Sequence, residues 1–133
     1  MNEKKLLIVD DDKECLKTLK KILIKMEYAA EVAAGSKEAL KILEKEKFPL
    51  IITDLDMPGL DGVELCKQIK ENDSKSIVYA LSGYITEYDT ENLEKSGFDG
   101  YLTKPVKIEV LQQAIEGAFD KLEQKSKGLQ DAD

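Results

Sequence analysis

The stretch LLIVDDD, residues 6–12, places four apolar residues directly before three consecutive aspartates. The apolar run has the composition of a β-strand covered on both faces. Neighbouring carboxylates repel each other, so the charged block must either face water or be compensated by positive charge. Apolar runs of strand length that end in polar residues recur along the chain. The apolar runs predict the fold, and the polar residues at their ends predict the site.

Apolar segments of strand length alternate with segments of helical periodicity along the whole sequence. The predicted strands are KLLIV (5–9), YAAEVA (28–33), PLIIT (49–53), SIVYALS (76–82) and FDGYLT (98–103). Five strands that alternate with five helices indicate right-handed βαβ crossovers and an α/β fold, with a doubly wound parallel sheet between two helical layers. Residues 28–33 are expected to form an edge strand of this sheet.

The predicted helices show apolar residues spaced by three and four positions. They cover residues 13–26, 36–46, 63–71, 86–97 and 108–122. We expect Asp12 to be the N-cap of the first helix and Ser36 that of the second, because both residue types favour this position. Gly97 is expected to end the fourth helix.

The size and composition indicate one soluble globular domain. The 133 residues suit a single core, and the tail at 125–133 shows no apolar stripe, so it is expected to be disordered. The net charge of −7 argues against direct binding of nucleic acid or of an anionic membrane. No apolar run reaches the roughly 20 residues of a membrane span. Two cysteines are too few for a disulfide framework, which favours a cytoplasmic protein.

The absence of histidine narrows the chemistry. It removes histidine-assisted nucleophiles and histidine metal sites, and it means that the chain cannot carry a phosphohistidine. A metal held by oxygen ligands would be a hard ion such as Mg²⁺.

Polar side chains follow four of the five predicted strands. Asp10 and Asp11 follow the first strand, Asp54 the third, Ser82 ends the fourth, and Lys104 follows the fifth. The carboxyl ends of parallel strands meet at one edge of the sheet, where ligands bind in such folds. Taken singly, each feature has a simpler interpretation: aspartates before a helix cap it and complement its dipole, and Lys-Pro is a strand exit.

Four segments together resemble the receiver domains of two-component response regulators. They are LIVDDD (7–12), IITDLDMPGLDG (51–62), ALSG (80–83) and YLTKP (101–105), in matching order within residues 4–122. The resemblance implies a flavodoxin-like (βα)5 sandwich with strand order 2-1-3-4-5, and a receiver domain over residues 1–124. It also implies a signalling module like the chemotaxis or sporulation regulators, which assists its own phosphorylation and dephosphorylation and is not a turnover enzyme. We expect either a free-standing receiver or the end of a longer protein.

The resemblance also implies roles for individual residues. Asp54 would be the phosphoacceptor, and Mg²⁺ would be bound by Asp10, Asp11, Asp54 and the backbone carbonyl of Asp56. Lys104 and Ser82 would contact the phosphoryl group. Ser82 and Tyr101 would form the switch pair that responds to phosphorylation. Asp56 and Tyr84 would tune the lifetime of the acyl phosphate. For Tyr101 the alternative is a half-buried strand aromatic.

The implied partners are a histidine kinase or a histidine phosphotransfer protein, and an unknown effector that binds the face of the fourth helix, fifth strand and fifth helix. Tyr84, Ile85 and Tyr88 are either contacts on that face or loop packing. We expect a monomer or weak dimer.

Charge explains why a metal would be needed. Asp10, Asp11, Asp54 and Lys104 carry a net charge of −2, and a phosphoryl donor adds about −2 more. The mutual repulsion would be on the order of 10 kcal/mol, and it should raise the pKa of at least one carboxyl when metal is absent.

Two other classes share parts of the pattern. A haloacid-dehalogenase-like phosphatase also uses an aspartate nucleophile with Mg²⁺, and DLDMP partly fits its motif. Its nucleophile follows the first strand, however, and Pro58 stands where that family has Thr or Val. A flavodoxin-like FMN carrier would place its phosphate loop where this chain has three aspartates.

Overall fold

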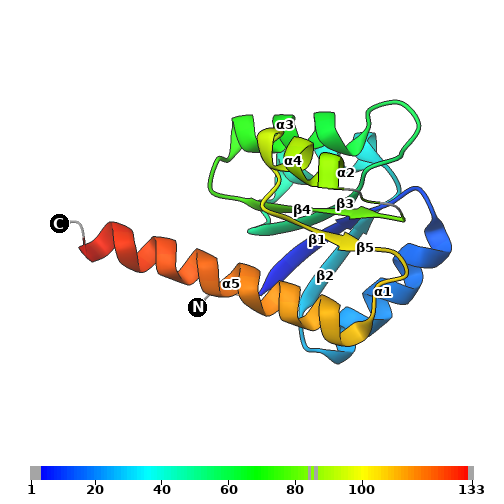
Figure 1. Cartoon of the computed structure of the whole chain (residues 1–133). Coiled ribbons are helices and arrows are strands. Elements are labelled where there is room, and N and C mark those ends of the chain that lie inside the picture. Colours follow the sequence, from blue (N-terminus) through cyan, green and yellow to red (C-terminus); the bar gives the residue numbers. More distant parts are fainter. Residues whose placement is uncertain (1–3, 84, 86, 132–133) are drawn as a thin grey trace.

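The computed structural model describes residues 4–83, 85 and 87–131, and its centre is one parallel β-sheet (Figure 1). The order β2-β1-β3-β4-β5 and the parallel pairing of every neighbouring strand confirm the predicted fold. The strands are β1 (Lys5–Val9), β2 (Ala29–Ala33), β3 (Leu50–Asp54), β4 (Ile77–Ser82) and β5 (Gly100–Thr103).

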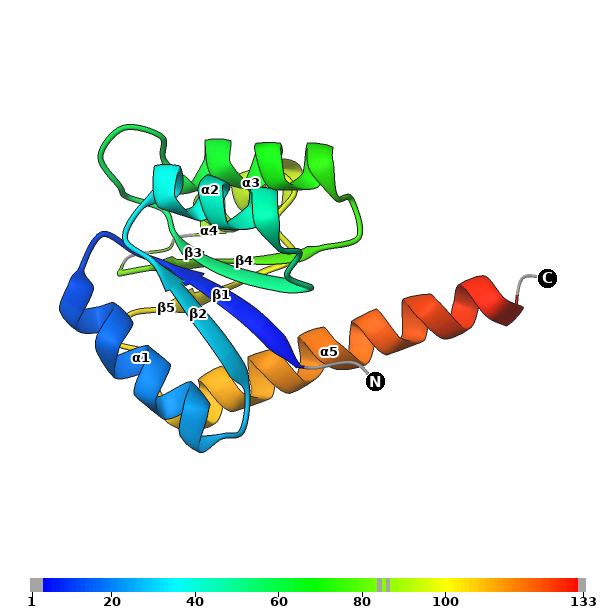
Figure 2. The ribbon, with the colours of Figure 1, turned by 180° about the vertical axis from the view of Figure 1, so that it is seen from behind.

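Helices cover both faces of the sheet. One face carries α1 and α5, and the other carries α2, α3 and α4, as the two opposite views show (Figures 1 and 2). None of the described helices is long and apolar enough to cross a membrane. The helices are α1 (Lys13–Lys25), α2 (Ser36–Lys45), α3 (Gly62–Asn72), α4 (Glu87–Lys95) and α5 (Ile108–Asp131).

The core consists of two clusters separated by the sheet. Leu6 and Ile8 of β1 pack with residues of α1 and α5, whereas Leu7 and Val9 pack with residues of α2, α3 and α4. Side chains alternate between the two faces of a strand, so a strand covered on both faces has no polar alternation. The unbroken apolar runs of β1, β3 and β4 follow from this arrangement.

The two predicted N-caps have different outcomes. Asp12 caps α1 as expected, and its side chain accepts hydrogen bonds from the backbone N–H groups of Glu14 and Cys15. The prediction for Ser36 is wrong, because Gly35 is the N-cap of α2 and Ser36 is its first helical residue. The Ser36 hydroxyl bonds to the carbonyl of Leu60 and not to its own helix.

The two predicted helix ends also differ in outcome. The end of α4 is confirmed, since Gly97 has a φ of +105°, a backbone conformation that favours glycine. The tail expected to be disordered over 125–133 is helical through Asp131, and this end of α5 projects beyond the sheet (Figures 1 and 2). Residues 125–131 contain no proline, and elongation of an existing helix costs little. An apolar stripe is therefore not required for the helix to continue.

A close contact at Gly62, the first residue of α3, yields a test of the fold. A Cβ atom there would lie 2.2 Å from the backbone oxygen of Asp54, so a side chain would push α3 away from β3. We expect Gly62→Ala to lower the free energy of unfolding by about 1–3 kcal/mol.

Gly117 in α5 is the matched control, because a Cβ atom there meets nothing within 4 Å. Gly117→Ala should raise stability by roughly 0.5–1 kcal/mol through helix propensity. Urea unfolding followed by circular dichroism measures both variants. Equal midpoints for the two alanine variants would contradict the proposed contact.

Candidate functional site

The sheet register brings four sequence-distant segments to one edge. The last residues of β1, β3 and β4 stand side by side, with Val9 paired to Thr53 and Asp54 paired to Leu81. Two backbone hydrogen bonds extend this alignment beyond the strands, from Asp10 N–H to the Ala33 carbonyl and from Lys104 N–H to the Ser82 carbonyl. Asp10, Asp54, Ser82 and Lys104 therefore share the carboxyl edge of the sheet, as the sequence predicted.

Three carboxylates form a cluster at this edge. One oxygen each from Asp10, Asp11 and Asp54 lies within 4.8 Å of the other two. Asp10 and Asp54 are buried, and Asp11 is exposed to solvent. The cluster thus has two enclosed ligands and one that opens to water, so that an ion could enter with part of its hydration shell.

Asp10 is held from two directions. Its Oδ1 accepts a hydrogen bond from the Asp12 N–H at 3.0 Å, and its Oδ2 lies 2.9 Å from Lys104 Nζ. Among the described residues no donor meets Asp10 Oδ2 with good hydrogen-bond geometry. Burial works to raise the pKa of Asp10, but the Asp12 N–H and the Lys104 ammonium outweigh it, and the pKa is lowered.

Lys104 is the cation of the site. Its Nζ lies 3.4 Å from Asp54 Oδ2 in addition to its contact with Asp10. Burial works to lower the pKa of Lys104, but the two carboxylates outweigh it and raise the pKa. The peptide bond between Lys104 and Pro105 is cis. The ammonium group is therefore charged and placed between both buried acids.

Asp54 shows the opposite electrostatic balance from Asp10. Burial raises its pKa, and the negative charge of Asp10 raises it further, against the opposing effect of Lys104. The expectation that one carboxyl has a raised pKa is confirmed, with burial as the larger cause. Ionisation of Asp54 is therefore less favourable in the site than in water, and additional positive charge would favour it.

The other predicted residues lie at the same edge or beside it. The Asp56 N–H donates to Asp54 Oδ1 at 3.3 Å, which places the main chain of Asp56 against the cluster. Ser82 is buried, and Tyr101 on β5 is 48% exposed. The register pairs Tyr101 with Ala80, so Tyr101 and Ser82 point toward the same face of the sheet. Tyr84 lies outside the described residues, as does the side chain of Tyr88, whereas Ile85 packs partly against the core.

Two features of the site had no clear signal in the sequence. Ser36 contacts the loop after β3, although a serine at the start of a helix is typical of a cap. Cys15, in the first turn of α1, lies beside Asp10, where burial and the Asp10 charge raise its pKa to about 11. Its thiol is therefore protonated at neutral pH.

The cluster fits a hard divalent cation. Carboxylate oxygens are the ligands that Mg²⁺ prefers, and this ion retains several waters, so that few protein ligands suffice. Asp10 Oδ2 is the buried polar atom that such a cation would satisfy. The three carboxylates thus suit such an ion in both chemistry and arrangement.

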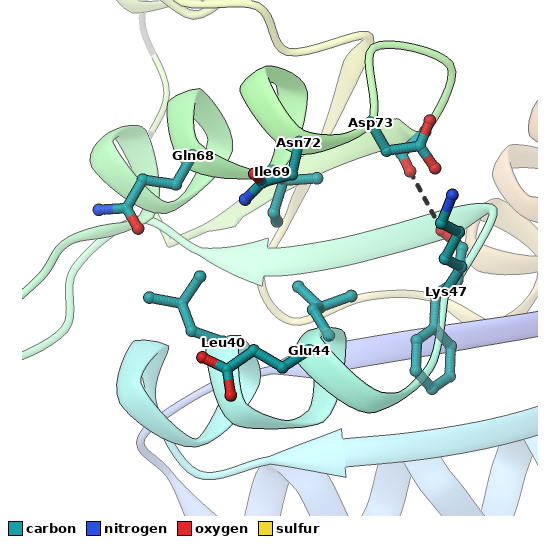
Figure 3. A pocket seen from close by; sticks show the side chains of 10 residues that line it. Leu40, Glu44, Lys47, Gln68, Ile69, Asn72 and Asp73 are labelled. Carbon is teal, nitrogen blue, oxygen red and sulfur yellow. Dashed lines mark hydrogen bonds between the residues drawn. The ribbon is translucent and has the colours of Figure 1, made fainter.

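A cavity of about 360 Å³ lies elsewhere, between α2 and α3 (Figure 3). It is lined by Phe48 and Ser76, which precede β3 and β4, so it lies at the opposite end of the sheet from the carboxylates. Leu40 and Glu44 on α2 face Gln68 and Ile69 on α3 across it (Figure 3). Within the described residues, no metal-binding group of three side chains occurs there.

Comparison with known proteins agrees with the geometry. Residues 6–116 match the response regulator receiver domain family. The alkaline phosphatase synthesis transcriptional regulatory protein PhoP of Bacillus subtilis (strain 168) is 36% identical over 102 residues. The match covers 77% of this chain but only 42% of PhoP, so the chain spans less than half the length of this relative.

Two solved structures show the same architecture. A CheY-like response regulator receiver domain protein from Methanospirillum hungatei JF-1 superposes with a TM-score of 0.87 at 31% identity, covering 93% of this chain and 99% of that one. The receiver domain of Saccharomyces cerevisiae Ssk1, solved together with the histidine phosphotransfer protein Ypd1, has a TM-score of 0.79 at 29% identity, with coverage of 85% and 86%.

The acidic cluster, the lysine beside it and the order of the strands thus occur in a chain that matches one family over most of its length. This protein belongs to the receiver domain family of two-component response regulators.

Proposed function

We propose that this receiver accepts a phosphoryl group on Asp54 in an Mg²⁺-dependent transfer from a phosphohistidine of a partner protein. The observation that carries the proposal is the grouping of Asp10, Asp11 and Asp54 within 4.8 Å, beside the Lys104 ammonium. A buried carboxylate with a raised pKa gains most from a cation, and it is the residue that would take up the phosphoryl group.

The transfer forms one bond and breaks one. An oxygen of the Asp54 carboxylate attacks phosphorus, and the bond between phosphorus and the donor's imidazole nitrogen breaks, leaving that imidazole free. Bound Mg²⁺ would supply charge neutralisation and orient the phosphoryl oxygens. Asp10, Asp11, Asp54 and the carbonyl of Asp56 would hold the ion. Lys104 and the Ser82 hydroxyl would each contact a phosphoryl oxygen.

The response to phosphorylation would run through Ser82 and Tyr101. The Ser82 side chain is buried at the edge of the sheet, next to β5, where Tyr101 is half exposed on the same face. Movement of the Ser82 hydroxyl toward the phosphoryl group would leave space for the Tyr101 ring. The surface formed by α4, β5 and α5 would then change, and an effector that prefers this form would shift the population further. Asp56 and Tyr84 would tune the lifetime of the acyl phosphate.

The donor imidazole lies outside these 133 residues, because they contain no histidine. The structure of Ssk1 with Ypd1 supports a histidine phosphotransfer protein as one kind of donor, and a histidine kinase is the other. We propose a cytoplasmic signalling module, monomeric or weakly dimeric, which does not turn over substrate. A haloacid-dehalogenase-like phosphatase would instead hydrolyse p-nitrophenyl phosphate, and this activity should be absent.

The phosphoacceptor can be identified by mass. With acetyl phosphate and Mg²⁺ we expect one adduct of about 80 Da, the mass of one phosphoryl group, and its loss in Asp54→Asn. Asp73→Asn is the control, because Asp73 follows α3 at the opposite end of the sheet. Intact mass spectrometry with peptide mapping gives the result. An adduct on any residue other than Asp54 would refute the assignment.

The role of Lys104 can be separated from that of the metal. Lys104→Ala leaves the buried Asp10 carboxylate without its ammonium partner, so without Mg²⁺ we expect a loss of about 2–3 kcal/mol in the free energy of unfolding. Saturating MgCl₂ should recover more stability in the variant than in the wild type, because the added cation replaces the lost charge. Urea unfolding in EDTA and in MgCl₂ measures both, and an equal Mg²⁺ effect in the two proteins would contradict this electrostatic role.

The switch pair can be observed with a phosphoryl analogue. Beryllofluoride with Mg²⁺ should shift the ring resonances of Tyr101 in NMR spectra, because its surroundings change when the Ser82 hydroxyl moves. The shift should be strongly reduced in Ser82→Ala, which lacks the hydroxyl but still contains the metal ligands. If the ring resonances of Tyr101 shift to the same extent in both proteins, the Ser82 hydroxyl does not cause the change in the surroundings of the ring.

A further inference from the structure

Ser36 forms a bond that is unusual for its position. A serine at the start of a helix normally caps that helix with its hydroxyl. Here the side chain is buried, and its Oγ donates to the carbonyl oxygen of Leu60 at 2.6 Å, across 24 residues of sequence. Glu38 accepts the Ala34 N–H at 3.0 Å in the same turn. The hydroxyl of Ser36 therefore connects α2 to a separate segment of the chain.

That segment is the loop over residues 55–61, which follows Asp54. The Leu55 N–H bonds to the Leu81 carbonyl at 3.2 Å, and the Gly62 N–H bonds back to the Leu55 carbonyl at 3.1 Å. Near its start, the Asp56 N–H donates to Asp54 Oδ1. Near its end, Leu60 receives the Ser36 hydroxyl. The loop that contains Asp56 is thus bonded near both of its ends.

We propose that Ser36 is a positioning residue for the metal site. The hydroxyl fixes the far end of the 55–61 loop against the start of α2, and it thereby keeps the main chain of Asp56 next to Asp54. This inference rests on the proposed function, in which Asp54 and the Asp56 carbonyl hold the cation. Loss of the hydroxyl should weaken cation binding without removing any ligand.

Ser76 provides a matched control. Like Ser36 it is a buried serine whose hydroxyl donates to a backbone carbonyl of another segment, that of Phe48, at 3.2 Å. It lines the cavity between α2 and α3, at the opposite end of the sheet from the carboxylates. Ser76→Ala therefore removes the same chemical group and the same kind of bond, at a place remote from the carboxylates.

The experiment measures the Mg²⁺ dissociation constant of the unphosphorylated protein by NMR titration. We expect Ser36→Ala to raise this constant about two- to fivefold, the factor that corresponds to part of one neutral hydrogen bond. The Mg²⁺ dissociation constant of Ser76→Ala should stay within about twofold of the wild-type value. This should hold even if Ser76→Ala and Ser36→Ala lower the urea midpoint to a similar degree.

A second measurement needs no variant. During Mg²⁺ titration of the wild type, the amide signals of Ser36 and Leu60 should shift with the same saturation curve as the signal of Asp56. Unshifted Ser36 and Leu60 signals, or equal Mg²⁺ constants for Ser36→Ala and the wild type, would overturn the positioning role alone. A wild-type protein that binds no Mg²⁺ would overturn the proposed function as well.

Discussion

The concentration of negative charge at the carboxyl edge of the sheet is the constraint on which the rest of the site depends. Asp10, Asp11 and Asp54 place three carboxylates against one ammonium, and two of these acids are buried. Isolated buried charges are costly unless they are paired. Lys104 lies within ion-pair distance of both buried acids but cannot neutralise all three. The cluster therefore keeps an excess of negative charge, and Asp11 exposes it to solvent.

The two buried acids lie in the same site, but their pKa values shift in opposite directions. Asp10 has a backbone N–H on one oxygen and the ammonium by the other, which lowers its pKa. Asp54 is more strongly affected by burial and by the charge of Asp10, and its pKa is raised. Asp10 is thus the better stabilised anion of the two. Asp54 is the less stabilised anion, so additional positive charge would favour its ionised form more strongly.

The scaffold places these groups through main-chain geometry. Parallel register aligns the ends of β1, β3 and β4, and the two covered faces hold the sheet rigid. The loop after Asp54 is held by the close approach of Gly62 to the Asp54 backbone and by the Ser36 hydroxyl. The site thus depends on α2 and α3 as well as on the strands. Both helices lie on the same face of the sheet and contact the segment that follows Asp54.

Much of this architecture was determined by the sequence alone. The unbroken apolar runs and the 3.6-residue stripes predicted five strands and five helices, because burial on both faces leaves a readable pattern. The position of Asp10, Asp11, Asp54, Ser82 and Lys104 at strand ends predicted a shared edge, since parallel strands end together. Local rules also predicted the cap at Asp12 and the helix end at Gly97.

Other features were decided only by the tertiary structure. The partner of the Ser36 hydroxyl lies 24 residues away, so a rule about local capping could not identify it. The opposite pKa shifts of Asp10 and Asp54 arise from burial and from the placement of Lys104. Sequence patterns record which residues are apolar and how they are spaced, whereas electrostatics and long-range hydrogen bonds depend on distances that exist only once the chain has folded.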